Sequence, residues 1–273
     1  MRAVLGIDAA WTLTEPSGVA LAVEQGGVWR LVAAAASYRR FEAHADDSLP
    51  SEPRPSGSMP DAASLLAAAA VLCGQPVDLI AVDMPLAQSA ITGRRASDNA
   101  VSRAYGGRKC STHSPNAIRP GRISDDLREG FGLAGYPLRT GDAEPPSLIE
   151  VYPHPALVEL AGAPQRLPYK ARKVRRYWPS ITPAERRVRL LAQWAAIVAL
   201  LEDEIAGVSA ELPPLGRGER GAAVKAYEDT LDAVICAWVG VCALQGRALP
   251  FGDDVSAIWI PVAGVDPLRC SLA

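Results

Sequence analysis

Four aspartates lie at places in the sequence where an unpaired charge would be energetically costly. Asp8 and Asp83 each end an apolar, strand-like run of residues. Asp229 and Asp232 are three residues apart in an apolar helical segment, so they share one face of that helix. Carboxylates gathered in this way repel one another unless a cation bridges them or they share a proton. Because hard oxygen ligands favour Mg²⁺ or Mn²⁺ over Zn²⁺, the four aspartates predict a divalent-metal site.

Each of these aspartates also has a structural interpretation. Asp8 could cap the turn that follows it, and Asp83, which precedes Met-Pro, could belong to a turn. Asp229 could pair with Lys225, one helical turn earlier. One such residue alone is more typical of structure than of catalysis. The metal hypothesis therefore depends on two strand ends and one helix face presenting acids together.

Glu150 is a fifth acid of interest and lies within the short apolar segment 148–152. If this segment is a strand, its neighbours Ile149 and Val151 point to the opposite face of the sheet. Glu150 is then either on the solvent side of an edge strand or a member of the site.

Two basic segments accompany the acids. The first follows the Asp83 strand, and its cations are Arg94, Arg95, Arg103, Arg108, Lys109, Arg119 and Arg122, against Asp98 as its one acid. Guanidinium groups match phosphate oxygens, so this segment predicts phosphate binding. The second mixes cations with aromatic residues and contains Tyr169, Lys170, Arg172, Lys173, Arg175, Arg176, Tyr177 and Trp178. Its composition suits stacked bases and phosphates, and it equally suits a solvated charged surface.

Composition limits the other functional classes. The formal net charge of −2 gives no global basic field, so nucleic-acid binding would need a local patch. The five cysteines include no CxxC pair, which argues against a zinc site or a disulfide framework. The sequence shows neither a signal peptide nor an apolar stretch long enough for a membrane span. We therefore expect a cytoplasmic protein with no membrane partner, and the oligomeric state stays open.

The predicted elements describe one α/β domain over residues 1–273. Segments 4–8, 19–23 and 28–36 predict three antiparallel strands, and the Gly26-Gly27 pair forms the turn of the hairpin. Later strands are predicted at 77–82, 148–152 and 258–262, and helices at 61–73, 155–160, 182–205 and 221–244. A flexible loop is expected at about 43–60 and an irregular basic insertion at about 88–147. Together these elements predict a mixed sheet with flanking helices.

This order of elements resembles the ribonuclease H-like superfamily, and the acid spacing is most similar to RuvC-type resolvases. In those enzymes one acid ends strand one, another ends strand four, and two more form Asp-x-x-Asp-Ala on the last helix. The segment Asp229-Thr230-Leu231-Asp232-Ala233 matches that spacing, as do Asp8 and Asp83.

The chain as a whole resembles an uncharacterised bacterial and archaeal family of predicted nucleases with a ribonuclease H-like fold, a domain of unknown function. The similar segments are 6–10, 81–86, 95–98 with Arg103, 150–155 and 229–237. The resemblance implies an acid cluster with a basic Arg/Asp loop, and it adds Glu150 and Lys170 to the candidate site. Arg95 and Asp98 could instead pair with each other, which would position the arginine.

The favoured hypothesis is a metal-dependent nuclease in which Asp8, Asp83, Asp229 and Asp232 hold two Mg²⁺ or Mn²⁺ ions. Glu150 is a further catalytic candidate, and Arg95, Arg103 and Lys170 are candidates for binding the phosphate of a nucleic acid or a small phosphodiester.

Two alternatives share the fold. The first is a phosphotransfer or nucleotide-binding protein of the actin-like ATPase or sugar kinase type. Those proteins carry Asp-x-Gly-x-Thr after the first strand, and the segment 8–12 has alanines and a tryptophan instead, which disfavours a close phosphate approach. The second is a nucleic-acid-binding protein without catalysis, which would bind without depending on metal.

Overall fold

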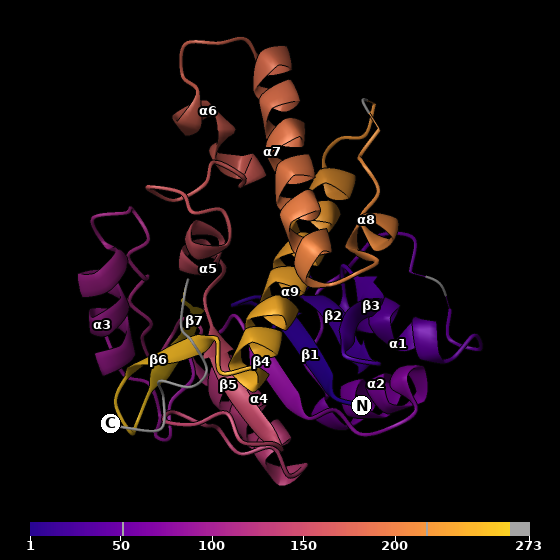
Figure 1. The fold of residues 1–273 in the computed structure, drawn as a ribbon, viewed down its shortest axis with the longest axis vertical. Helices are drawn as coiled ribbons and strands as arrows, with labels where there is room; N and C mark the ends of the chain where they lie inside the picture. The colour runs from indigo at the N-terminus through magenta and orange to yellow at the C-terminus, as the bar shows by residue number, and fades with distance from the viewer. Residues whose placement is uncertain (51, 217, 263–273) are drawn as a thin grey trace.

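The computed structural model describes residues 1–50, 52–216 and 218–262. Within them the chain forms one seven-stranded sheet in the order β3-β2-β1-β4-β5-β7-β6 (Figure 1). The strands are β1 Ala3–Asp8, β2 Gly18–Gln25, β3 Val28–Ala35, β4 Leu79–Val82, β5 Ser147–Val151, β6 Ala248–Gly252 and β7 Ala257–Pro261. β1, β2 and β3 pair antiparallel, β1, β4, β5 and β7 pair parallel, and β6 runs antiparallel to β7. The sheet is therefore mixed, as predicted.

Helices cover both faces of this sheet. They are α1 Tyr38–Ala45, α2 Ala62–Cys73, α3 Ala96–Tyr105, α4 Arg122–Leu133, α5 Pro153–Leu160, α6 Val174–Tyr177, α7 Pro183–Glu204, α8 Val208–Glu211 and α9 Ala222–Leu244, with a 3₁₀ turn at Ala171–Lys173. One hydrophobic cluster joins α5, α7 and α9 to one face, and a second joins α1, α2 and α4 to the other. α9 crosses the centre of the sheet beside α7 (Figure 1).

Local sequence signals set the ends of several helices. Asp61 accepts hydrogen bonds from the N–H groups of Ala63 and Ser64 at the start of α2. Gly74 ends that helix in the left-handed conformation, with φ of 74°. Thr182 and Glu185 form the predicted capping box of α7.

α9 lies unusually close to the sheet because glycines face it. A Cβ on Gly6 of β1 would lie 2.3 Å from the backbone nitrogen of Ala237, and one on Gly18 of β2 would lie 2.1 Å from the carbonyl oxygen of Asp229. Further along the helix, a Cβ on Gly240 would clash with Val4 at 2.5 Å. Only residues without a side chain allow the helix and the strands to approach this closely.

Several elements differ from the sequence predictions. Residues 43–45 belong to α1, so the predicted loop begins later, and the described part of 46–61 has neither helix nor strand. α5 begins at Pro153 rather than at the predicted Pro155. Short elements such as β6, α6 and α8 were not predicted; β6 pairs with the neighbouring β7, and α6 and α8 pack on the neighbouring α7.

Two further observations concern the cysteines and the possibility of a membrane span. The cysteines of the described residues, Cys73, Cys110, Cys236 and Cys242, are free thiols, and Cys270 lies outside the described residues. None of the helices in the described residues combines the length and the apolar character that crossing a membrane requires.

Replacing Gly6 by alanine is expected to lower the free energy of unfolding by about 3 kcal/mol or more. The new Cβ would clash with backbone atoms of Ala233 and Ala237. Relieving the clash would require β1 and α9 to move apart. Urea unfolding followed by circular dichroism measures the change. Gly132→Ala is the matched control, because its Cβ in α4 meets open space and alanine favours helix. Equal stability of the Gly6 variant and the wild type would contradict the close approach.

Candidate functional site

Asp8 and Asp83 are neighbours at the carboxyl ends of two parallel strands. Ile7 pairs with Val82 across β1 and β4, and the N–H of Asp83 donates to the carbonyl of Ile7 at 2.8 Å. Side chains alternate between the faces of a strand, so Asp8 points to the same face as Gly6, which α9 covers. The same alternation along β4 turns Asp83 toward α9.

α9 brings the other two predicted aspartates to this point. Gly18 lies opposite Asp8 in the β1–β2 pairing, and the backbone of Asp229 packs directly on Gly18. Asp229 is 1% exposed and Asp232 is 0% exposed. The negative charges of Asp232, Asp229 and Asp83 each raise the pKa of Asp8. The structure thus gathers the four predicted aspartates into one group, which we call the acid cluster.

Two lysines enter the acid cluster. Lys170 donates a hydrogen bond to Asp232, and the Tyr169 hydroxyl donates to the same carboxylate at 2.7 Å. The Lys170 ammonium also lies 4.9 Å from the centre of the Tyr169 ring. Lys225 donates to Asp229 from one helical turn away. Asp229 and Asp232 are therefore partly neutralised within the chain.

Burial is the main cause of the raised pKa values of the aspartates in the cluster. Burial raises the pKa of Asp8 well above its usual range, and repulsion by Asp232 adds to the shift. Burial also raises the pKa of Asp83 and of Asp229 to about 7, against the attraction of a nearby lysine in each case. Burial by itself lowers the pKa of Lys170, but attraction to Asp232 and Asp8 outweighs it and raises that pKa.

The described residues contain no group of three or more histidine, cysteine, aspartate or glutamate side chains already arranged to hold a metal ion. Within the same residues, ion pairs reach Asp229 and Asp232 but not Asp8 or Asp83. The Oδ2 atom of Asp229 is buried and has no hydrogen-bond partner. An unpaired buried carboxylate oxygen is costly, so the cluster carries more negative charge than its two lysines balance.

Glu150 and Arg95 form a separate buried network. Arg95 donates to the two carboxylate oxygens of Glu150 at 2.5 and 2.8 Å, and to Asp98 at 2.9 Å. The N–H of Leu86 donates to Glu150 at 2.8 Å, and the carbonyl of Leu86 accepts from Arg95 at 2.7 Å. Glu150 and Arg95 thus bind each other and hold the segment that follows Asp83.

The remaining predicted site residues have contrasting positions. Lys170 lies within the acid cluster, whereas Arg103 is exposed on α3 and lines none of the cavities described below. Sequence reasoning missed Glu228, which is 5% exposed and accepts from the N–H of Ala171 at 2.5 Å. A usable signal existed, because Glu228 precedes Asp232 by four residues on the same helix face. It also missed Arg166, a loop residue with no periodic pattern.

A cavity of about 320 Å³, the central cavity, opens beside the acid cluster. Asp83 and Glu228 line it, as does His154, whose imidazole pKa burial lowers well below the usual range. Its cationic lining residues, apart from the paired Arg95, are Arg166, Lys170, Arg172, Lys173 and Lys225. Carboxylates beside such cations can bind an anionic group and a metal ion together.

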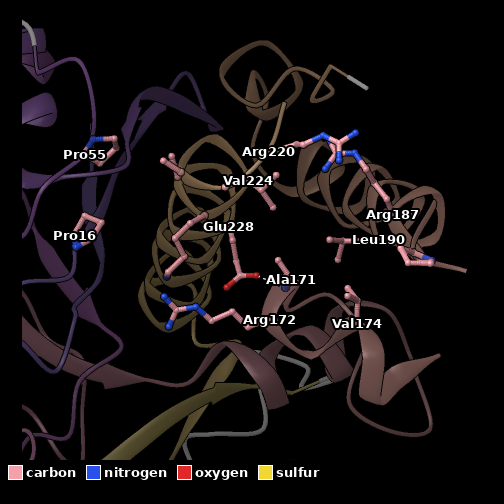
Figure 2. A pocket seen from close by; sticks show the side chains of 15 residues that line it. Pro16, Pro55, Ala171, Arg172, Val174, Arg187, Leu190, Arg220, Val224 and Glu228 are labelled. Atoms are coloured by element: carbon pink, nitrogen blue, oxygen red, sulfur yellow. Dashed lines mark hydrogen bonds between the residues drawn. The ribbon is translucent and has the colours of Figure 1, made fainter. Parts of the chain in front are cut away.

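A second, larger cavity of about 640 Å³, the apolar cavity, adjoins the first and shares Arg172, Lys225 and Glu228 with it. Figure 2 shows Arg187 and Arg220 on one side of this cavity and Arg172 and Glu228 on the other. The N–H of Ala171 donates a hydrogen bond to Glu228 on that second side. Prolines, Val174, Leu190 and Val224 supply most of the remaining surface.

A family model described as Protein of unknown function (DUF429) matches residues 6–257. The chain belongs to this family. The matched region includes the acid cluster, the Arg95 network and all the residues that line the central cavity except Ile258. No curated protein and no solved structure matches the chain.

Asp83→Asn is expected to stabilise the metal-free protein at pH 8 by about 1 kcal/mol. A carboxyl group whose pKa is higher in the folded than in the unfolded chain destabilises the fold as it ionises. The wild type, without divalent metal, should therefore lose stability as the pH rises from about 4 through 7. Urea unfolding in EDTA from pH 5 to 8 measures both effects. Asp47→Asn, at an exposed position, is the control and should change nothing.

Arg95→Ala is expected to lower the free energy of unfolding by about 3–5 kcal/mol, because it leaves Glu150 and Asp98 buried without their partner. The control is Arg103→Ala, at an exposed position of α3. It should change the free energy of unfolding by less than about 0.5 kcal/mol. Thermal and urea unfolding of the two variants give the comparison. Similar small losses in both would show that the network contributes little to stability.

Proposed function

We propose that this protein is a metal-dependent phosphodiesterase that cleaves nucleic acid. The observation that carries the proposal is the convergence of four carboxylates from β1, the end of β4 and α9 beside a cavity with cationic walls. Metal-dependent phosphodiester hydrolysis uses both features, because the metal requires oxygen ligands and positive charge binds the phosphate of the substrate.

The topology supports a ribonuclease H-like fold as the setting. Three antiparallel strands come first, and β4 and β5 then extend the sheet parallel to β1. We infer the ribonuclease H-like assignment from this order together with the positions of the acids. Asp8 and Asp83 lie at the ends of the first and fourth strands, and Asp229 and Asp232 lie on a late helix.

The residues of the acid cluster fit a hard divalent cation. The donors are carboxylate oxygens, which favour Mg²⁺ or Mn²⁺. Asp8, Asp83 and the unpartnered oxygen of Asp229 are the natural ligands of one ion. Asp232 is already bound by Lys170 and Tyr169, so a second ion would have to displace Lys170.

When bound, such an ion would lower the pKa of an attacking water molecule and stabilise the oxygen that leaves. The lysines at the cavity, Lys170 and Lys225, would neutralise charge on the phosphodiester. Arg166 and Lys173 would orient it from the wall. Arg95 acts indirectly in this scheme, since it holds the segment after Asp83 through Glu150 and Leu86.

Asp8→Asn is expected to reduce hydrolysis at least about a hundredfold. The assay uses bis(4-nitrophenyl) phosphate and fluorescent 12-nucleotide DNA and RNA strands with Mn²⁺, each repeated in EDTA. Asp47→Asn is the control for a lost surface carboxylate and should keep full activity. Calorimetry with Mn²⁺ alone should show a site in the wild type that the Asp8 variant lacks.

Full activity of the Asp8 variant, or wild-type activity in EDTA, would contradict the proposal. Saturable ATP binding together with intact strands would favour the phosphotransfer alternative instead. Binding of strands without any metal dependence or cleavage would favour a nucleic-acid-binding protein that is not an enzyme.

A further inference from the structure

A third cavity lies next to the central cavity and is lined mainly by cations. Its volume is about 480 Å³, and we call it the basic cavity. The residues that line it are Lys109, Gln165, Arg166, Pro168, Lys173, Arg176, Tyr177 and Trp178. Four of these are cations and none is an acid. Arg166 and Lys173 also line the central cavity, so the two cavities meet at these side chains.

The cations of the basic cavity lack partners of opposite charge. Among the described residues, none of the four forms an ion pair with a carboxylate, and the Nε atom of Arg166 is buried without a hydrogen-bond partner. Burial lowers the pKa of Lys173, and repulsion by Arg166, Lys170 and Arg176 lowers it further. Like charges held this close together are stabilised by an anion between them.

The apolar cavity also contains cations without a carboxylate partner, but they do not adjoin the central cavity. Its Arg172 pairs with Glu15 at 3.2 Å, whereas among the described residues Arg187 and Arg220 form no ion pair, and the Nε of Arg187 is buried without a hydrogen-bond partner. Figure 2 shows that Arg187 and Arg220 lie on its far side from Arg172 and Glu228, with an apolar surface between them. The unpartnered positive charge that adjoins the central cavity is therefore concentrated in the basic cavity.

Aromatic rings lie beside this charge. Tyr177 and Trp178 pack edge to face with their ring centres 5.8 Å apart, and both side chains are partly exposed. Aromatic faces next to a cationic groove bind the bases of single strands without regard to sequence. A cavity of this volume has room for a phosphate with part of a nucleotide, but it is too small for a duplex.

We infer that the basic cavity binds a backbone phosphate adjacent to the one in the central cavity, so that the substrate is a single-stranded nucleic acid rather than an isolated small phosphodiester. Arg166 and Lys173 lie between the two phosphates and contact both. Lys109 and Arg176 hold the phosphate of the basic cavity, and Trp178 contacts its sugar or base. This inference rests on the proposed function, because it uses the central cavity as the place of cleavage.

The test is the binding of a fluorescent 12-nucleotide strand in EDTA, where no metal-dependent cleavage occurs. Fluorescence anisotropy at several salt concentrations compares Arg176→Gln with Arg175→Gln. Both arginines are exposed residues of α6, but only Arg176 lines the basic cavity. Arg176→Gln should weaken binding about tenfold and reduce the slope of log Kd against log salt by about 0.7, as expected for one lost contact to a single strand.

Arg175→Gln should change the affinity less than about twofold, and a duplex of the same length should bind more weakly than the single strand. Equal effects of the two variants would overturn the inference, as would tighter binding of the duplex or no binding by the wild type. DNA and RNA strands are compared in the same assay to identify the preferred backbone. Because binding is read without metal, a failure of hydrolysis would count against the acid cluster and not against the basic cavity.

Discussion

The close approach of α9 to β1 and β2 is the constraint on which the rest of the structure depends. Gly6 and Gly18 lack side chains at the crossing point, so backbone atoms of the helix rest directly on the strands. This contact places Asp229 and Asp232 beside Asp8, and the parallel pairing of β1 with β4 adds Asp83. A crossing one side chain further away would separate the acids and weaken the Coulomb repulsion between them.

Hydrogen bonding divides the buried carboxylates into two kinds. In the network of Arg95, Glu150 and Asp98, both carboxylates pair with the single guanidinium of Arg95. The network holds the segment after Asp83 in place. In the acid cluster, Lys170 and Lys225 neutralise only part of the negative charge, and Asp229 has a buried oxygen without a hydrogen-bond partner. Burial raises carboxylate pKa values in both groups, and a buried carboxylate oxygen without a partner is typical of sites that bind an additional cation.

The basic cavity, which adjoins the central cavity, has an excess of positive charge. Arg166 and Lys173 line both the central and the basic cavity, so the excess positive charge lies next to the excess negative charge of the acid cluster. A strand of nucleic acid with a bound metal ion would satisfy both at once, because its phosphates carry the negative charge and the ion the positive. This complementarity also explains how a chain with a net charge of −2 could bind a polyanion locally.

The sequence by itself determined the strands and long helices whose apolar periodicity and caps are local, such as the helix from Asp61 to Gly74 and the capping box at Thr182. It also indicated the four aspartates, because a charge inside an apolar run is visible without a structure. Only the tertiary structure decided the partners of each charge. The sequence did not show that Arg95 binds Glu150 in the wall of the central cavity, and Arg166 gave no signal because its position there depends on loops brought together by folding. Hydrogen bonds and charge pairs between distant segments depend on three-dimensional distances, which local spacing does not encode.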